Sequence, residues 1–162
     1  MYTRYFPRLH YACVLVVVRA LRVGGRTDTG LQFQAPEVSG LELLVDMLEE
    51  SEQVTNLARR LTEMSVAQLS DELQLILTED NAAPFVTHLA IALTRINRGD
   101  PEIAASAVAE EEIADRQRER DAVNRVMHDC SRLLQREISM SEISYMTVHL
   151  CVMVDLQSET CQ

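Results

Sequence analysis

Apolar residues recur at spacings of three and four along the chain from residue 40 onward. Three stretches show this spacing first, over residues 41–48, 54–64 and 66–77. Such spacing places apolar side chains on one face of an α-helix and polar side chains on the other. Three amphipathic helices are therefore predicted ahead of the polar cluster at residues 79–81, and each needs a partner surface for its apolar face.

A fourth helix is predicted over residues 82–98. Asp80 or Asn81 can cap its start, and Pro84 suits its first turn because the N–H that proline lacks is not needed there. Gly99 follows the last apolar position, which is typical of a helix end.

Two more helices are predicted in the last third of the chain. Residues 109–136 carry acids near the start and arginines near the end, an order that complements the helix dipole, and they are interpreted as one long helix. Ser139 and Glu142 have the spacing of a capping box. A last helix is therefore predicted over residues 139–155.

The amino-acid composition also favours helices. Hydrophobic residues make up 47% of the 162 residues and charged residues 25%, whereas the chain has only 5 glycines and 4 prolines. A chain of this length buries most of its apolar surface around one core. We therefore predict an all-α fold, a compact bundle of about five helices.

The first 36 residues differ in charge from the rest. They contain five arginines and one acid, Asp28, whereas the remainder is strongly acidic. We place a boundary near Pro36, with a helical domain over residues 37–162 and an N-terminal extension over residues 1–36 that has no assigned role and for which disorder is one reading. The apolar run at residues 12–18 is shorter than the roughly 20 residues that span a bilayer, so no membrane partner is expected.

Charge and cysteine spacing narrow the classes of function. The formal net charge of −10 argues against direct binding of nucleic acid, which depends on cations that neutralise phosphates. No pair of cysteines has the spacing of a zinc site or of a disulfide framework. We therefore expect a protein of the reducing cytoplasm without a metal or cofactor. The four cysteines are Cys13, Cys130, Cys151 and Cys161.

Two histidines are the candidate reactive groups. His88 and Arg95 are seven residues apart, so they share the flank of one predicted helix, about 10 Å apart along its axis. His149 falls in the apolar arc of the last helix, where an imidazole needs a hydrogen bond or costs stability. The residues alone leave two readings open for each: a structural histidine, or a nucleophile held between helices. His128 falls on a polar face and is predicted to be a surface residue.

Both histidines lie in segments that resemble signatures of the PTS regulation domain family. FVTHLAIALTRINRG, residues 85–99, is similar to the family's first histidine helix, in which an arginine follows the histidine at the seventh place and a glycine comes soon after. EISYMTVHL, residues 142–150, resembles its closing motif, an acid followed by an apolar stretch that ends in histidine. Thr87 stands where the family often has aspartate before the first histidine. The resemblance covers residues 41–155, a single copy without an attached effector domain.

The resemblance implies a regulatory module of the sugar phosphotransferase system that is reversibly phosphorylated on histidine. His88 and His149 would be the phospho-acceptors, and Arg95 and Glu142 would pair with the phosphate or support the site. The phosphate would come from a phosphocarrier protein or a sugar-permease subunit. The domain would not be an enzyme; it would control a transcriptional regulator or another partner in trans, and a homodimer is expected.

Two other functions remain as alternatives. One is an acidic helical module that binds a partner protein and is never phosphorylated. The other is a metal enzyme that uses His88, His149 and a carboxylate such as Glu142, although no local ligand pair supports it. The feature that separates the first alternative from the phosphorylated regulator is whether the two histidines lie close together and reach solvent.

Overall fold

The computed structural model describes residues 40–160, and side chains as far as residue 158. This part of the chain folds into six helices and no strand, so the all-α prediction is confirmed. The N-terminal extension predicted for residues 1–36, with His10 and Cys13, lies outside the described residues, as does Cys161. The helices are α2 (Gly40–Glu50), α3 (Asn56–Leu73), α4 (Glu79–Arg98), α5 (Ala107–Glu112), α6 (Gln117–Leu134) and α7 (Met140–Thr160).

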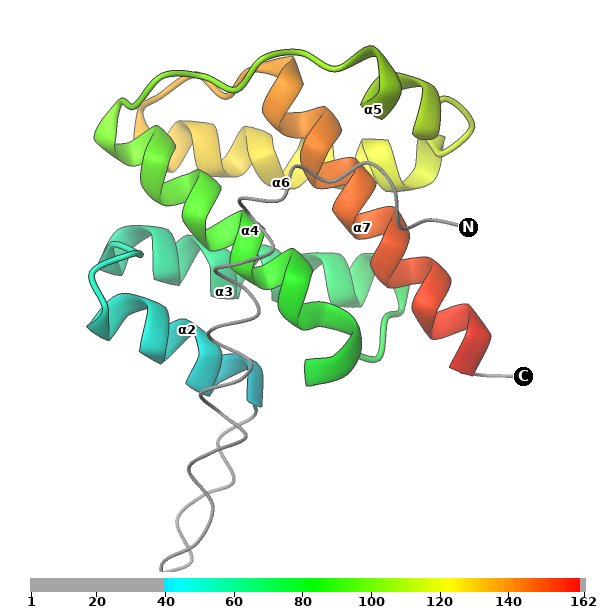
Figure 1. Ribbon diagram of the computed structural model, residues 1–162, viewed down its shortest axis with the longest axis horizontal. Coiled ribbons are helices and arrows are strands. Elements are labelled where there is room, and N and C mark those ends of the chain that lie inside the picture. Colours follow the sequence, from blue (N-terminus) through cyan, green and yellow to red (C-terminus); the bar gives the residue numbers. More distant parts are fainter. Residues whose placement is uncertain (1–39, 161–162) are drawn as a thin grey trace, which may run out of the picture. The chain divides into compact units, whose positions relative to one another are not determined.

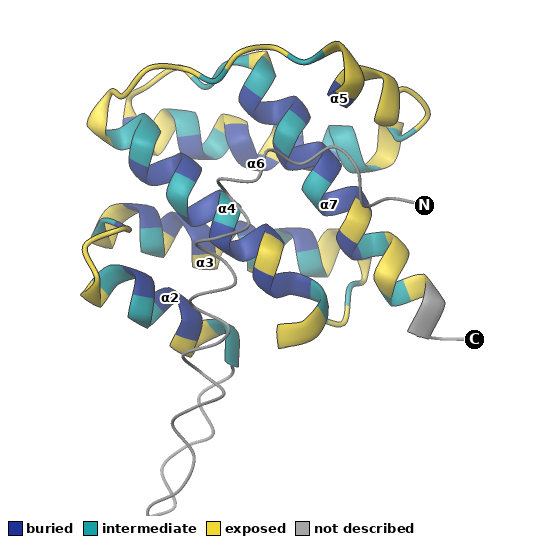
Figure 2. Ribbon diagram, viewed as in Figure 1, coloured by how far each residue is buried: buried dark blue, intermediate teal, exposed yellow. Residues whose placement is uncertain are grey.

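Helix α4 packs against α2, α3 and α7, and α6 packs against α3 and α7. In Figure 1, α4 and α7 run side by side in opposite directions, with α3 and α6 lying across them. In Figure 2 the middle parts of α4 and α7 are largely buried, whereas the ends of both helices are exposed. The largest fully buried apolar side chains are Leu48, Leu69, Phe85, Leu89, Leu93, Ile113, Val123, Val126 and Leu150.

Helix α3 corrects the prediction of two separate helices over residues 54–64 and 66–77. A single helix runs from Asn56 to Leu73 and ends at Gln74, whose φ of 56° is left-handed. No glycine or proline interrupts the junction, and the buried Ser65 hydroxyl donates to the Leu61 carbonyl oxygen at 2.7 Å. The helix therefore runs through the junction without a break, since no residue there is a helix breaker.

Helix α4 begins three residues earlier than predicted, because Thr78 is its N-cap. The Thr78 hydroxyl accepts from the Asn81 N–H at 3.3 Å, and the Asn81 side chain accepts from the Thr78 N–H at 2.9 Å. This reciprocal pair means that neither Asp80 nor Asn81 is the cap. Pro84 consequently lies beyond the first turn, which contradicts the predicted position. The predicted end at Gly99 is confirmed by its left-handed φ of 74°.

The predicted long helix over residues 109–136 is wrong, since α5 and α6 are separated by a turn at residues 113–116. Ile113 is only 1% exposed and belongs to a small apolar cluster with Ala109, Val148 and Cys151. Arg116, at the end of the turn, bonds to Asp155 of α7 at 2.9 Å. Both contacts fasten the turn to α7, so tertiary packing overrides the local helical pattern.

Helix α7 extends from Met140 to Thr160, beyond the predicted end at residue 155. The Ser139 hydroxyl accepts from the Glu142 N–H at 3.5 Å, which is one half of the predicted capping box. The Glu142 carboxylate instead pairs with Arg95 of α4. Within residues 40–160, no helix combines the length and the apolar character needed to cross a bilayer.

Candidate functional site

His88 of α4 and His149 of α7 lie against each other. Their ring centroids are 4.0 Å apart, and the two ring planes are inclined by 17°, so the imidazoles are stacked. Both residues are partly exposed, and the contact between their rings joins α4 to α7. The fold thus brings together two histidines that are far apart in the sequence, and it leaves both within reach of solvent.

Arg95 and Glu142 form a second contact between the same two helices. Arg95 follows His88 by seven residues and Glu142 precedes His149 by seven, so in antiparallel helices the two pairs lie two turns apart. The Arg95 guanidinium donates to Glu142 Oε1, and the two side chains are 27% and 4% exposed. The predicted phosphate partner of His88 is thus paired with the predicted supporting carboxylate.

The Glu142 carboxylate is held in an unusual environment for an acid. Burial raises its pKa above the ordinary value, while the charge and hydrogen bond of Arg95, and to a smaller extent the backbone of Ile103, act in the opposite direction. Oε2 of the same carboxylate is buried and has no hydrogen-bond partner among the described residues. Arg95 is thus the main group that favours the ionised form of Glu142.

A polar pocket of about 220 Å³ lies beside this ion pair, between the end of α4 and the loop before α7. Arg136 lines it together with Arg95 and Glu142, and no sequence signal placed Arg136 there, because it belongs to a loop whose path depends on tertiary packing. His88 and His149 line neither this pocket nor the wider groove of about 560 Å³ along α6. Both histidines are partly exposed.

A family model described as PRD domain matches residues 63–151, more than half of the 162-residue chain. The chain belongs to the PRD domain family. The family is a regulatory domain family of the phosphotransferase system, which confirms the resemblance found in the sequence. No curated protein and no solved structure gives a significant match to the chain.

The PRD domain match includes all four predicted site residues. It begins within α3 and ends within α7, so it contains His88, Arg95, Glu142 and His149. Thr87, which stands where the family often has aspartate, is buried. The position before His88 therefore turns toward the core, and the partly exposed groups near the histidines come from other positions.

His128 does not belong to this arrangement. It lies on α6, is exposed as predicted, and lines the wider groove. The carboxylate of Glu142 forms an ion pair with Arg95. The described residues contain no group of three histidine, cysteine or acidic side chains placed to hold a metal ion. The arrangement of these side chains thus lends no support to the metal-site alternative.

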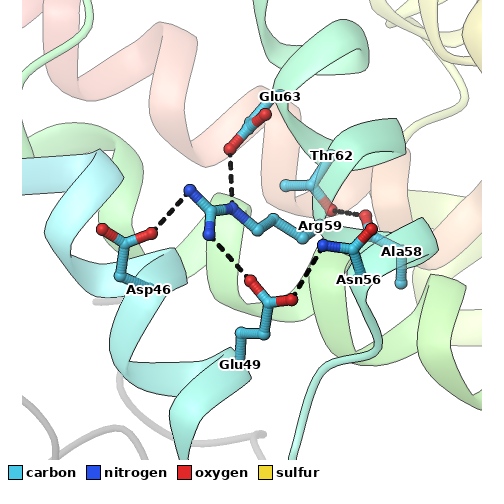
Figure 3. A network of polar contacts seen from close by, with 7 residues as sticks. All are labelled: Asp46, Glu49, Asn56, Ala58, Arg59, Thr62 and Glu63. Carbon is cyan, nitrogen blue, oxygen red and sulfur yellow. Dashed lines mark hydrogen bonds and ion pairs between the residues drawn. The ribbon is translucent and has the colours of Figure 1, made fainter.

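Helix α2 precedes the PRD domain match and is attached to it by a network around Arg59 (Figure 3). The Arg59 guanidinium contacts Asp46 at 2.6 Å and Glu49 at 2.7 Å, both on α2, and Glu63 of its own helix at 3.0 Å. The hydrogen bond from Arg59 is the main cause of a lowered pKa of Glu49. The network joins α2 to α3 and lies away from the histidine pair along the chain.

Proposed function

We propose that this PRD domain protein is a regulatory module of the sugar phosphotransferase system, phosphorylated reversibly on His88, His149 or both. It controls a transcriptional regulator or another partner in trans. The observation that carries the proposal is the stacked, partly exposed histidine pair within the matched range. A module that only binds a partner has no evident reason to gather two imidazoles from different helices.

Phosphoryl transfer requires little of the acceptor imidazole beyond correct placement. The donor is a phosphohistidine of a phosphocarrier protein or of a sugar-permease subunit. A lone pair on a neutral imidazole nitrogen attacks the phosphorus, a new N–P bond forms, and the donor's N–P bond breaks as its ring leaves with the electron pair. The other nitrogen of the acceptor ring keeps its proton. Because both donor and acceptor are imidazoles, the transfer is reversible and needs no further reactant.

Arg95 is the proposed partner of the new phosphate. A phosphoryl group brings about 1.5 to 2 negative charges to the line between α4 and α7, and a guanidinium can donate to its oxygens in pairs. Arg95 lies two turns from the histidines and is partly exposed, so its side chain can turn toward them. Such a turn would take it from Glu142, which is buried and would lose its cation.

The movement of Arg95 from Glu142 to the phosphate would link phosphorylation to the binding of a partner protein. With Arg95 withdrawn, the α4–α7 contact loses its ion pair, and Glu142 must take up a proton or the helices must shift. We propose that the two arrangements differ in how they present this surface to a second copy of the chain or to a separate regulator. The protein acts through such contacts and not as an enzyme.

The acidic charge of the chain suits a basic donor. With a net charge of −10, association with a phosphocarrier that docks through a basic patch should be fast at low salt and slower at high salt. Equal rates of association at both salt concentrations would remove this part of the proposal.

The proposed function is tested by phosphate transfer. The full-length protein is incubated with phosphoenolpyruvate, the first phosphotransferase enzyme and the phosphocarrier, and acid-labile phosphate is measured. The wild type and a His128→Ala control should be labelled, and the double variant His88→Ala/His149→Ala should not. If a donor system of proven activity labels none of them, the protein is better described as an acidic helical interaction module.

A further inference from the structure

We propose that Arg136 is a second, alternative cation for Glu142, and that it turns into the polar pocket of about 220 Å³ when Arg95 leaves the ion pair. The loop between α6 and α7, which carries Arg136, then closes on this pocket. The inference rests on the proposed function only for the event that draws Arg95 away. The exchange of the two arginines is a property of the unphosphorylated chain.

Glu142 requires a cation because it is buried. Its side chain is 4% exposed, and its Oε2 is buried without a hydrogen-bond partner among the described residues. Burial raises its pKa and the negative charge of Glu102 adds to this, whereas Arg95 and, to a smaller extent, the backbone of Ile103 favour the ionised form. Loss of Arg95 therefore leaves a buried carboxylate close to another negative charge, which is a costly arrangement.

Arg136 lines the same pocket and is available to replace Arg95. It is exposed, and its side chain forms no ion pair or hydrogen bond with another described residue. Its two terminal nitrogens lie 3.6 and 3.7 Å from the position that a Cβ atom on Gly99 would take. The guanidinium thus rests against the C-terminal end of α4, where the helix dipole favours a cation. Its movement toward Glu142 breaks no ion pair with a described residue.

Other pairings around the pocket are weaker. Arg98 is exposed, donates to the Glu52 carbonyl oxygen at 3.1 Å and does not line the pocket. Three further acids line the pocket, but they are exposed and already solvated, so a cation stabilises them little. The electrostatic gain is therefore largest when Arg136 pairs with the buried Glu142. The three exposed acids are Asp100, Glu102 and Glu137.

The exchange would couple the α4–α7 ion pair to the loop between α6 and α7. This loop is short and fixed at both ends: Gln135, with a left-handed φ of 53°, ends α6, and the Ser139 hydroxyl accepts from the Glu142 N–H at 3.5 Å. When Arg136 turns from Gly99 toward Glu142, the loop gives up its contact with the end of α4. Release of Arg95 is thereby transmitted from the two helices to the loop.

The test is a double-mutant cycle on the unphosphorylated full-length protein, read by the urea midpoint at neutral pH and by carbon NMR of the Glu142 carboxyl group. In the wild-type background, Arg136→Met should change neither reading, because Arg95 holds Glu142. In the Arg95→Met background, it should lower the midpoint and raise the Glu142 pKa further, so the losses exceed additivity. Arg136→Lys should keep part of the Arg136 effect. Arg98→Met is the matched control and should add to Arg95→Met without excess.

Two results would overturn the inference. One is an equal Glu142 pKa in Arg95→Met and Arg95→Met/Arg136→Met, with additive losses in the urea midpoint. The other concerns a double variant that fails to fold while Arg95→Met/Arg98→Met folds. Addition of Glu142→Gln must then restore folding, because it removes the buried charge; if it does not, Arg136 acts elsewhere in the fold. Since these proteins are unphosphorylated, failure of the proposed function would leave the readings unchanged.

Discussion

Replacing Arg95 with methionine removes the cation of the α4–α7 ion pair while it keeps a long apolar side chain. Glu142, which is 4% exposed, then loses its charged partner. Its other carboxylate oxygen, Oε2, already lacks a hydrogen-bond partner among the described residues. Breaking a buried ion pair from one side costs about 3 to 5 kcal/mol. Because Arg95 is 27% exposed, water weakens the original pair, and we expect a loss of about 2 to 3 kcal/mol in the free energy of unfolding at neutral pH.

The loss should depend on pH with a definite sign. Burial raises the pKa of Glu142 in the folded chain, so the folded state holds this proton more tightly than the unfolded state. Stability then falls as the pH rises through the folded pKa, and the fall is steeper without Arg95, which opposes the shift. The cost of Arg95→Met should therefore be full well above the folded pKa and should shrink as the pH falls through the raised folded pKa of Glu142, before the ordinary pKa of glutamate is reached.

The measurement is urea unfolding followed by far-ultraviolet circular dichroism at several pH values. Arg98→Met is the matched control, because Arg98 lies one turn further along α4 and is exposed; its cost should stay within about 0.5 kcal/mol. Combining Arg95→Met with Glu142→Gln should recover part of the loss, since no charge is then buried without a partner. A loss of less than about 0.5 kcal/mol for Arg95→Met, equal at all pH values, would refute the reasoning.

Three further substitutions test the fold. Thr78→Ala removes the N-cap of α4 and should cost about 1 kcal/mol in urea unfolding. Leu150→Ala opens a cavity at a side chain with 0% exposure and should cost about 2 to 5 kcal/mol by the same assay, without a change in helix content at low temperature. Glu49→Gln removes a carboxylate whose pKa is lowered mainly by Arg59, so the wild type should be the more stable protein above the ordinary pKa of glutamate. That advantage should vanish as the pH falls through the lowered pKa, and thermal melts across this range would show it.

Helix positions could be predicted wherever local rules decide them. The apolar spacing located α2, the spacing of Ser139 and Glu142 located the start of α7, and Gly99 marked the end of α4, because a left-handed φ suits glycine. The break at residues 113–116 could not be predicted, since it depends on Ile113 and Arg116 contacting α7, a helix that is distant in the sequence. The start of α4 was misplaced because threonine and asparagine are both good caps, and only the structure shows that Thr78 takes the position.

In the candidate site, too, local sequence patterns predicted which residues take part but not how they contact one another. Helical spacing correctly placed His88 and Arg95 on one flank of α4, and the two family signatures identified His149 and Glu142. The register between α4 and α7 decides whether the two imidazoles stack and whether Arg95 pairs with Glu142. Register between helices follows from the packing of the whole bundle, which no single segment of sequence specifies.

The central claim is that phosphate is carried on the stacked histidines. Nuclear magnetic resonance of the phosphorylated protein with isotope-labelled histidine tests it directly, because coupling between phosphorus and a ring nitrogen identifies the modified ring. We predict such coupling for His88 or His149, with a changed signal of its stacked neighbour and an unchanged signal of His128. Coupling only at another histidine, or a phosphate without coupling to any ring nitrogen, would contradict the account.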